Sequence, residues 1–203
     1  MFIGVDVGGT NTDAVLMDGA NLLAKAKLPT TSDVTSGIVA SLKEVMAQGP
    51  SNGSIDGVMV GTTHFTNALL ERKELTPTAV LRLSLPATTL LPPLVDWPAP
   101  LREAIGGTNY MVSGGHEFDG REISPFNASE IAGATKEMKR QGIGAVAISG
   151  VFSPVNTAHE LEAAEVIRRE VPGLRIALSH ENGRIGLLER ENAAVLNACL
   201  GEV

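Results

Sequence analysis

The sequence has one cysteine, few aromatic residues and no long apolar run. Because it is single, Cys199 excludes an internal disulfide and fits a reducing compartment. Aromatic residues make up only 3% of the chain, so the core must consist of Val, Ile, Leu and Ala, as is typical of parallel sheets. The sequence shows neither a signal-peptide pattern nor the roughly 18 consecutive apolar residues that a membrane helix needs. We therefore expect a cytoplasmic protein.

Positive charge is also scarce. Lys and Arg number 16 against 23 Asp and Glu, which gives a net charge of −7. Such a surface repels the phosphate backbone of nucleic acids and anionic lipids, so neither a nucleic acid nor a membrane is expected as a partner. A small anionic ligand is still compatible with this charge, because backbone N–H groups bind phosphate without any net positive charge.

What remains is the composition of an ordered protein. Hydrophobic residues make up 43% of the 203 residues, and the mean hydropathy is +0.13, which argues against disorder. A chain of this length forms one large α/β domain or two small ones, and either buries a sizeable core.

The first 75 residues alternate between strand and helix patterns in an informative order. Gly8-Gly9 and Asp18-Gly19 separate short apolar strands, and both pairs are typical of turns. Three strands, a helix, a returning strand and a second helix predict a ribonuclease-H-like half-domain with a mixed sheet. The expected strands cover residues 2–7, 14–18, 21–28 and 57–63, and the expected helices cover residues 30–49 and 64–73.

The remainder of the chain predicts an appended α/β subdomain. Residues 86–107 are rich in proline and are expected to be irregular. Residues 109–126 contain Asp119-Gly120 and are expected to form a hairpin. A βαβ unit and a last helix follow, with helices at 129–140, 157–170 and from 186, and strands at 144–152 and 174–180.

The opening segment FIGVDVGGTNTDAVLMD is dense in glycine and small polar residues. Glycines permit positive φ and close backbone approach, so successive N–H groups converge on phosphate oxygens. No Gly-Lys-Ser/Thr sequence opens a helix here, so the pattern predicts a phosphate-binding hairpin and not a P-loop. The alternative is a tight hairpin whose polar residues satisfy only their own backbone. The predicted phosphate-binding residues are Gly8, Gly9, Thr10, Asn11 and Thr12.

Asp6 lies at the end of the first predicted strand, where an unpaired carboxylate would repel phosphate. It fits next to Mg²⁺, either directly or through a water, because the ion inverts the local charge. Asp6 is therefore the predicted metal ligand.

The segment GTTHFTNALLERK places a second polar group where a parallel strand ends and a helix begins. Ligands collect at such strand ends, and a helix N-terminus favours negative charge. Its candidates are Thr62, Thr63, Thr66 and Asn67, and the alternative is that a threonine only caps the helix. His64 has two interpretations, either a general base or substrate contact, or a structural histidine.

Two polar clusters further along the chain are weaker candidates. A metal site at His116, Glu117 and Asp119 is disfavoured, because neighbouring residues of a hairpin strand point to opposite faces. His180 and Glu181 follow a predicted strand end and are candidate site residues.

The last predicted helix carries few candidates of its own. Glu189 and Arg190 are expected to pair on the helix surface, as solvated charges usually do. Cys199 lies among Ala and Leu residues and is expected to be buried packing.

The segment DVGGTNTDAVLMD resembles the first phosphate motif of the actin-like ATPase superfamily, which includes sugar kinases and heat-shock chaperones. GTTHFTNALLERK is more specific, and with it the chain resembles the N-terminal region of the hydantoinase A/5-oxoprolinase family. GGHEFDGREISP, FSPVNTAHE and LSHENGRIGLLERENAAVLNA follow in the family's order, so the resemblance covers nearly the whole chain. The chain departs from the family at Asn11, where an aromatic residue is common, and at 191–194, where many members are rich in Ser and Thr.

The resemblance implies an enzyme that uses ATP and Mg²⁺ to open a small cyclic amide such as a hydantoin or 5-oxoproline. Phosphorylation of the amide oxygen would create a leaving group, and hydrolysis would follow. On this expectation Asp6 positions Mg²⁺, and Gly8 to Thr12 hold the β- and γ-phosphates. The implied catalytic residues are Asp6, Asp13, Thr62, Thr63 and Asn67.

Two other functions stay open. One is a small-molecule kinase on the same fold, and the other is a non-catalytic ATP-binding domain. Asp13 argues against the kinase, because glucokinase-like motifs often carry Lys, Arg or Ser at that position.

The resemblance also implies that the second half of the nucleotide-binding fold lies outside this chain. Actin-like ATPases hold the nucleotide between two related halves, and no second Asp-x-Gly-Gly-Thr follows residue 13. We therefore expect an N-terminal fragment that is inactive alone, whose partner is a second subunit or a C-terminal half that carries the adenosine-binding residues. A homo-oligomer is also open. The predicted domains are the phosphate-binding half-domain (1–83), an inserted α/β subdomain (84–180) and a helix leading to the missing half (181–203).

Overall fold

A computed structural model describes residues 1–31, 33–50 and 54–201 and divides the chain into two compact units, Met1–Glu71 and Arg72–Val203. The first contains β1 (Phe2–Val7), β2 (Asn11–Asp18), β3 (Asn21–Pro29), α1 (Val34–Gln48), β4 (Gly57–Thr62) and α2 (His64–Glu71). The second contains β5 (Thr78–Leu85), α3 (Ala99–Ala104), β6 (Asn109–Ser113), α4 (Ala128–Arg140), β7 (Ala145–Gly150), α5 (Ala158–Glu170), β8 (Arg175–Leu178), a 3₁₀ turn (Ser179–Glu181) and α6 (Leu187–Cys199). None of these helices has the length and apolarity that crossing a membrane requires.

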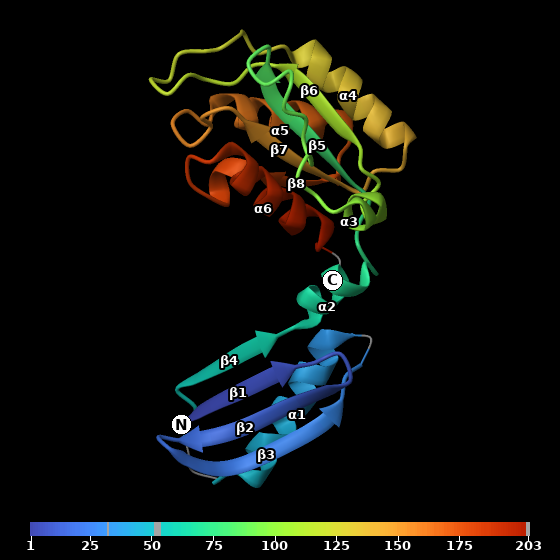
Figure 1. Ribbon diagram of the computed structural model, residues 1–203. Helices are drawn as coiled ribbons and strands as arrows, with labels where there is room; N and C mark the ends of the chain where they lie inside the picture. The colour runs from blue at the N-terminus through green and yellow to red at the C-terminus, as the bar shows by residue number, and fades with distance from the viewer. Residues whose placement is uncertain (32, 51–53, 202–203) are drawn as a thin grey trace. The chain divides into compact units, whose positions relative to one another are not determined.

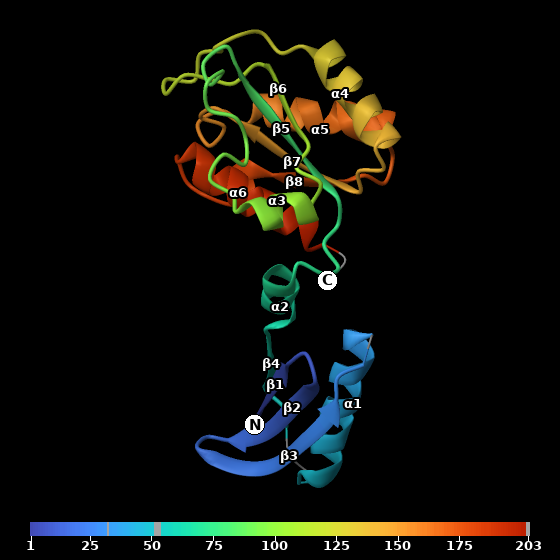
Figure 2. The same ribbon diagram turned by 45° about the vertical axis from the view of Figure 1, so that its right-hand side comes forward.

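The first unit is a mixed sheet with the strand order β3-β2-β1-β4. β1, β2 and β3 are antiparallel neighbours, and β4 returns parallel to β1. Helix α1 connects β3 to β4 and lies along one face of the sheet (Figures 1 and 2). The expected order of three strands, a helix, a strand and a helix is confirmed.

Strand alternation determines which side chains the first unit buries. Ile3, Val5 and Val7 are at most 3% exposed and pack with Val45 of α1. The intervening residues of β1 lie on the opposite, open face, because successive strand residues point to opposite sides. Asp33 caps α1 by accepting a hydrogen bond from the Thr35 N–H at 3.1 Å.

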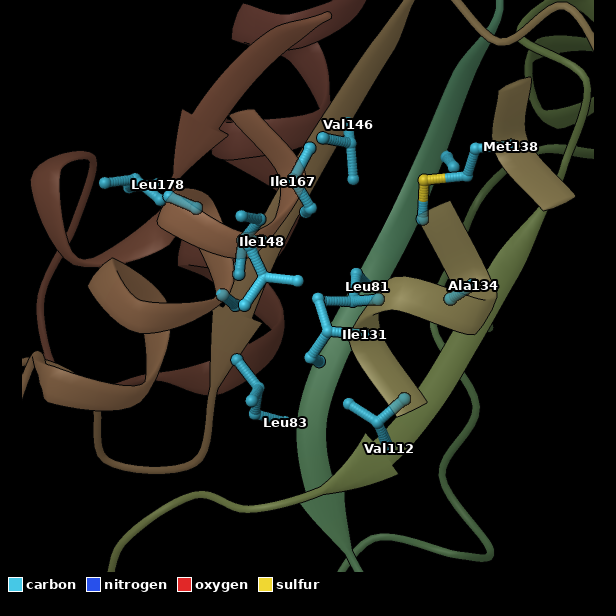
Figure 3. Close-up of a cluster of buried hydrophobic side chains, with 14 residues drawn as sticks. Leu81, Leu83, Val112, Ile131, Ala134, Met138, Val146, Ile148, Ile167 and Leu178 are labelled. Atoms are coloured by element: carbon cyan, nitrogen blue, oxygen red, sulfur yellow. The ribbon is translucent and has the colours of Figure 1, made fainter. Parts of the chain in front are cut away.

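The second unit is an all-parallel sheet with the strand order β6-β5-β7-β8. Its two central strands, β5 and β7, are buried along almost their whole length, which is the pattern of a sheet covered on both faces. α4 and α5 pack together on one face, where Leu81, Ile148 and Ile131 belong to one apolar cluster (Figure 3). α6 contacts the other side of β7 and β5.

The compact units divide the chain differently from the predicted domains, and one predicted hairpin is absent. Residue 83 falls inside β5, and the compact units divide at 71/72 because β5 pairs with β6 and β7 of the second sheet. The segment 109–126 does not form a two-stranded hairpin. Its first part, β6, runs parallel to β5, and only an isolated bridge between His116 and Glu122 remains antiparallel. Residues 181–201 belong to the second unit, where α6 covers the sheet.

A buried ion pair joins β5 to α6. The Arg82 Nε donates to Oε2 of Glu191 at 2.7 Å, and Nη2 donates to Oε1 at 2.5 Å, with both side chains 0% exposed. The Ser149 hydroxyl donates to the same Oε2 at 2.6 Å, and Arg82 also donates to the Leu91 carbonyl. These polar contacts of the pair therefore lie inside the second unit, with the sheet, α6 and the segment that follows β5.

The prediction that Arg190 pairs with Glu189 on the helix surface is wrong. Arg190 is 1% exposed, because α6 turns this side toward the end of β7. Its guanidinium donates to the Ser153 hydroxyl at 2.7 Å and to the Gly150 carbonyl at 2.6 Å, and Glu160 lies 3.6 Å away. Burial lowers the pKa of Arg190, and the neighbouring carboxylates oppose that shift.

Cys199 is fully buried on α6, which confirms its predicted packing role. Burial raises the pKa of its thiol to about 11. Because the thiolate is the nucleophile, we expect the folded chain to react with an aromatic disulfide reagent at pH 8 at least about 100-fold more slowly than the urea-unfolded chain. Absorbance of the released thiolate measures both rates, and equal rates would contradict the buried position.

Candidate functional site

The predicted site residues of the first unit gather at one end of its sheet. Asp6 is near the end of β1, the residues Gly8 to Thr12 form the turn and the start of β2, and Thr62 ends β4. The Thr62 hydroxyl donates to the Val7 carbonyl at 3.2 Å, and the Thr63 N–H donates to the same oxygen at 3.3 Å. The end of β4 and the start of α2 are thereby tied to the β1–β2 turn.

A few hydrogen bonds fix the conformation of the β1–β2 turn, and they do not use two of its backbone N–H groups. The Gly8 N–H donates to the Asn11 carbonyl at 2.9 Å, and the Gly8 carbonyl accepts from the Thr30 hydroxyl at 2.7 Å. The Thr30 N–H donates to the Thr10 carbonyl at 3.0 Å. Among the hydrogen bonds of the described residues, none uses the N–H of Gly9 or Thr10. These two amides are available to an anion such as a phosphate.

Thr12 has a different position from the other turn residues. Its side chain is 1% exposed, and its hydroxyl lies 3.2 Å from the Thr30 hydroxyl. It faces α1 because it alternates with Asn11 and Asp13, which lie on the open face. The Thr12 hydroxyl therefore stabilises the turn from the side of the sheet that α1 covers, and it does not point to the open face.

Asn67 approaches the turn from α2. Its Nδ2 lies 3.4 Å from the point that a Cβ on Gly9 would occupy. This distance is an ordinary van der Waals contact, and it places a neutral amide donor beside Gly9.

Two carboxylates face each other on the open side of the sheet. Asp6 and Asp13 are direct partners in the β1–β2 register, and Asp6 is exposed. Lys27 of β3 is opposite Asp13, and its Nζ lies 2.9 Å from each Asp13 carboxylate oxygen. Lys27 is absent from the sequence-based site, although the alternation of β3 places it on the open face. Thr30, which holds the turn, is also absent from that prediction.

Shallow cavities border these carboxylates. One of about 280 Å³ is lined by Asp6, Asp13, Val15 and Met59, and another of about 330 Å³ is lined by Asp13, Lys25 and Lys27. No group of three or more His, Cys, Asp or Glu side chains that could hold a metal occurs in the described part of the chain. Mg²⁺ usually needs only one or two carboxylates in addition to water and substrate phosphates, so the exposed Asp6 carboxylate fits this ion.

The histidine candidates occupy other positions. The side chain of His64 lies outside the described structure. His116 stacks on His159 in the second unit, at 4.3 Å between ring centroids. His180 follows β8, and its Nδ1 lies 2.7 Å from the buried carboxylate of Glu160. Glu181 is exposed next to it. His116, His180 and Glu181 belong to the second unit, whereas the β1–β2 turn belongs to the first.

Comparison with known proteins places the chain in a family. The sequence profile of the hydantoinase/oxoprolinase N-terminal region matches residues 2–171. The chain is 30% identical to the caprolactamase subunit alpha of Pseudomonas jessenii over 99% of its own length and 31% of that protein. It is 28% identical to the acetophenone carboxylase gamma subunit of Aromatoleum aromaticum, over 98% of its own length and 31% of that protein.

Solved structures share the fold. The crystal structure of the ATP-dependent caprolactamase from Pseudomonas jessenii matches with a TM-score of 0.69 and 26% identity, over 98% of this chain and 31% of that one. Nucleotide-free acetone carboxylase matches with a TM-score of 0.77 and 16% identity, over 99% of this chain and 32% of that one. The predicted actin-like ATPase fold class is thereby confirmed. The chain spans about a third of the length of these proteins and belongs to the hydantoinase/oxoprolinase N-terminal region family.

Proposed function

We propose that the chain is the phosphate-binding N-terminal part of an ATP-dependent enzyme that opens a cyclic amide. The observation that carries this proposal is the β1–β2 turn, where the Gly9 and Thr10 amides have no described partner and Asp6 is exposed beside them. Family membership and the resemblance to a caprolactamase subunit support the same function.

The chemistry explains why ATP is needed. An unstrained lactam resists water, because the amide carbonyl is weakly electrophilic and the amine leaves poorly. Transfer of the γ-phosphoryl group to the amide oxygen activates the carbonyl carbon, and ADP leaves. Water then adds to that carbon, the C–N bond breaks with a proton passing to nitrogen, and a second water releases phosphate from the acyl phosphate.

This chain supplies positioning and charge for the phosphoryl transfer. The Gly9 and Thr10 N–H groups and the Asn67 amide donate to phosphate oxygens, where fixed donors act without reorganisation. The Gly8 N–H and the Thr12 hydroxyl hold the turn in shape. Thr62 and Thr63 face the reacting centre from the end of β4.

The two carboxylates have separate roles in the proposal. Asp6 holds Mg²⁺, which would neutralise charge on the transferred phosphate when bound. Asp13 is oriented by Lys27 and faces the reacting centre. Lys27 also offsets part of the negative charge that two neighbouring carboxylates would otherwise build up.

The nucleotide site requires a further component. The chain matches about 31% of each subunit-type relative, and those relatives are alpha and gamma subunits by name. We infer that a second polypeptide or a C-terminal part carries the adenosine pocket and closes over the phosphates.

A carboxylase is the second candidate, because one relative is an acetophenone carboxylase subunit. Such an enzyme could share the phosphate-activation step and differ in the attacking group. A product assay separates these functions. The complete enzyme is incubated with ATP, Mg²⁺ and either ε-caprolactam, 5-oxoproline or a hydantoin, or a ketone with bicarbonate.

Ring-opened product with stoichiometric phosphate supports the proposal. A carboxylated ketone supports the second candidate, and a stable phosphorylated product identifies a small-molecule kinase. Absence of turnover with all substrates, together with Mg·ATP binding, supports a non-catalytic ATP-binding domain. Calorimetric titration of this chain alone with Mg·ATP should show weak binding, and tight binding would contradict the need for a further component.

A further inference from the structure

Two stacked histidines hold a surface segment of the second unit. His116 lies in the segment Gly114–Ser124, and His159 lies in the first turn of α5. Their ring centroids are 4.3 Å apart, and the side chains are only 2% and 3% exposed. Phe126 lies against His159 at 5.6 Å between ring centroids, so the pair is enclosed by an apolar neighbour as well.

Backbone contacts tie the same segment to the sheet. The Gly115 N–H donates to Nδ1 of His159 at 3.0 Å, and the His116 N–H donates to the Val151 carbonyl at 3.0 Å. A Cβ on Gly115 would lie 2.7 Å from the Leu83 carbonyl, and Gly115 has a φ of +85°. The backbone can approach β5 this closely only because the residue is glycine.

Both rings must be neutral for this arrangement. Nδ1 of His159 accepts a hydrogen bond, so its ring proton is on Nε2, which lies 3.4 Å from Oε1 of Glu122. A further proton on that ring would have to occupy Nδ1 and would displace the Gly115 N–H. A proton on His116 would place a charge inside the buried stack.

The charged surroundings of His116 do not compensate for a proton on that ring. Burial, and then His159, lower the pKa of His116 below its usual 6.5, and Glu122 and Glu162 oppose this with a smaller effect. Residues 151–157, which connect β7 to α5 beside the stack, contain no charged side chain. The closed state therefore binds fewer protons than the open one, so opening becomes easier as the pH falls below 6.5.

We propose that the His116–His159 stack is an acid-sensitive clasp, which holds the segment Gly114–Ser124 on the second sheet while both rings are neutral and releases it on protonation. The segment follows β6 and borders the carboxyl ends of the parallel strands, where open α/β sheets bind ligands. Release therefore changes the shape of that edge. The clasp is independent of the proposed function.

Amide hydrogen exchange followed by NMR tests the clasp in the intact chain. After correction for intrinsic exchange, protection of the Gly115 and His116 amides should fall at least about tenfold between pH 7.5 and pH 5.0. Protection of the Ile148 amide in β7 should stay within about threefold over the same range, because the opening is local.

Variants assign the response to the stack. His116→Phe keeps an aromatic ring and takes up no proton at this position, so the Gly115 amide should lose less protection at pH 5.0 than in the wild-type chain. His180→Gln is the matched control, because His180 bonds to Glu160 and not to the clasp, and it should keep the wild-type response.

Three outcomes would overturn the clasp: no loss of Gly115 protection in acid, an equal loss at Ile148, or an unchanged response in His116→Phe. If that variant does not fold, the ring signals of the wild-type chain decide. The His116 ring should titrate below pH 6.5 together with the loss of Gly115 protection. Titration that leaves this protection unchanged would overturn the proposal.

Discussion

Replacement of Glu191 with alanine is expected to lower the free energy of unfolding of the second unit by about 3–5 kcal/mol. The variant leaves the 0% exposed Arg82 guanidinium without a counter-charge and removes the acceptor of the Ser149 hydroxyl. Urea unfolding followed by tryptophan fluorescence measures the effect. Trp97 is the only tryptophan, and its indole N–H donates to Asn192 of α6 at 2.7 Å, so its signal reports on this helix.

A matched pair on the surface provides the control. Glu165 and Arg168 of α5 also form a Glu–Arg contact, at 2.6 Å, but with side chains 72% and 54% exposed. Glu165→Ala should change the free energy of unfolding by less than about 1 kcal/mol, because solvent screens the pair. The contrast between the two substitutions isolates the cost of an unpaired buried charge.

A double variant separates this charge effect from lost packing. Glu191→Ala combined with Arg82→Met removes both charges of this pair, so it should be more stable than Glu191→Ala alone. A loss below about 1 kcal/mol in the single variant would mean that water or a rearranged side chain reaches Arg82.

The β1–β2 turn was predictable because its sequence signals are local. An alternating apolar strand, two glycines and a second strand all fall within residues 2–18, and strand periodicity alone places Asp6 and Asp13 on one face. The contacts of Thr62 and Thr63 with Val7 follow from parallel pairing of β4 with β1, which the βββαβα order already implied.

Lys27 and Thr30 were not predictable in the same way. Their contacts depend on the register of β3 against β2, which includes an irregularity at Leu16/Met17. A turn sequence such as Asp18-Gly19 predicts that two strands pair, but an irregularity shifts which residues are opposite each other.

The buried charges of the second unit were hidden for a different reason. Arg82 and Glu191 are 109 residues apart in sequence, and no local pattern links them. Arg190 was assigned to the surface because charged side chains of helices are usually solvated. Whether the Arg190 side chain is buried depends on which side of α6 packs on β7. That packing is a tertiary contact, which helical periodicity alone does not predict.

Replacement of Asp6 with asparagine is expected to slow ATP-dependent ring opening at least about 100-fold, in an enzyme preparation shown to open a lactam. Asparagine keeps the size and hydrogen-bonding oxygen of the side chain but removes the negative charge that holds Mg²⁺ in the proposal. Because Asp6 is exposed, the free energy of unfolding should change by less than about 0.5 kcal/mol. Steady-state rates over a range of Mg²⁺ concentrations measure the effect.

The Mg²⁺ dependence separates a metal-holding carboxylate from a merely structural one. In Asp6→Asn the Mg²⁺ concentration for half-maximal rate should rise. Loss of structure would instead lower the maximal rate and leave that Mg²⁺ concentration unchanged. Asp18→Asn is the control, since Asp18 is an exposed carboxylate at the far end of β2, and both quantities should match the wild type. If Asp6→Asn retained the wild-type rate and Mg²⁺ dependence, the proposal that Asp6 holds Mg²⁺ would be wrong. The Gly9 and Thr10 amides would then bind phosphate with the cation held by the remainder of the enzyme.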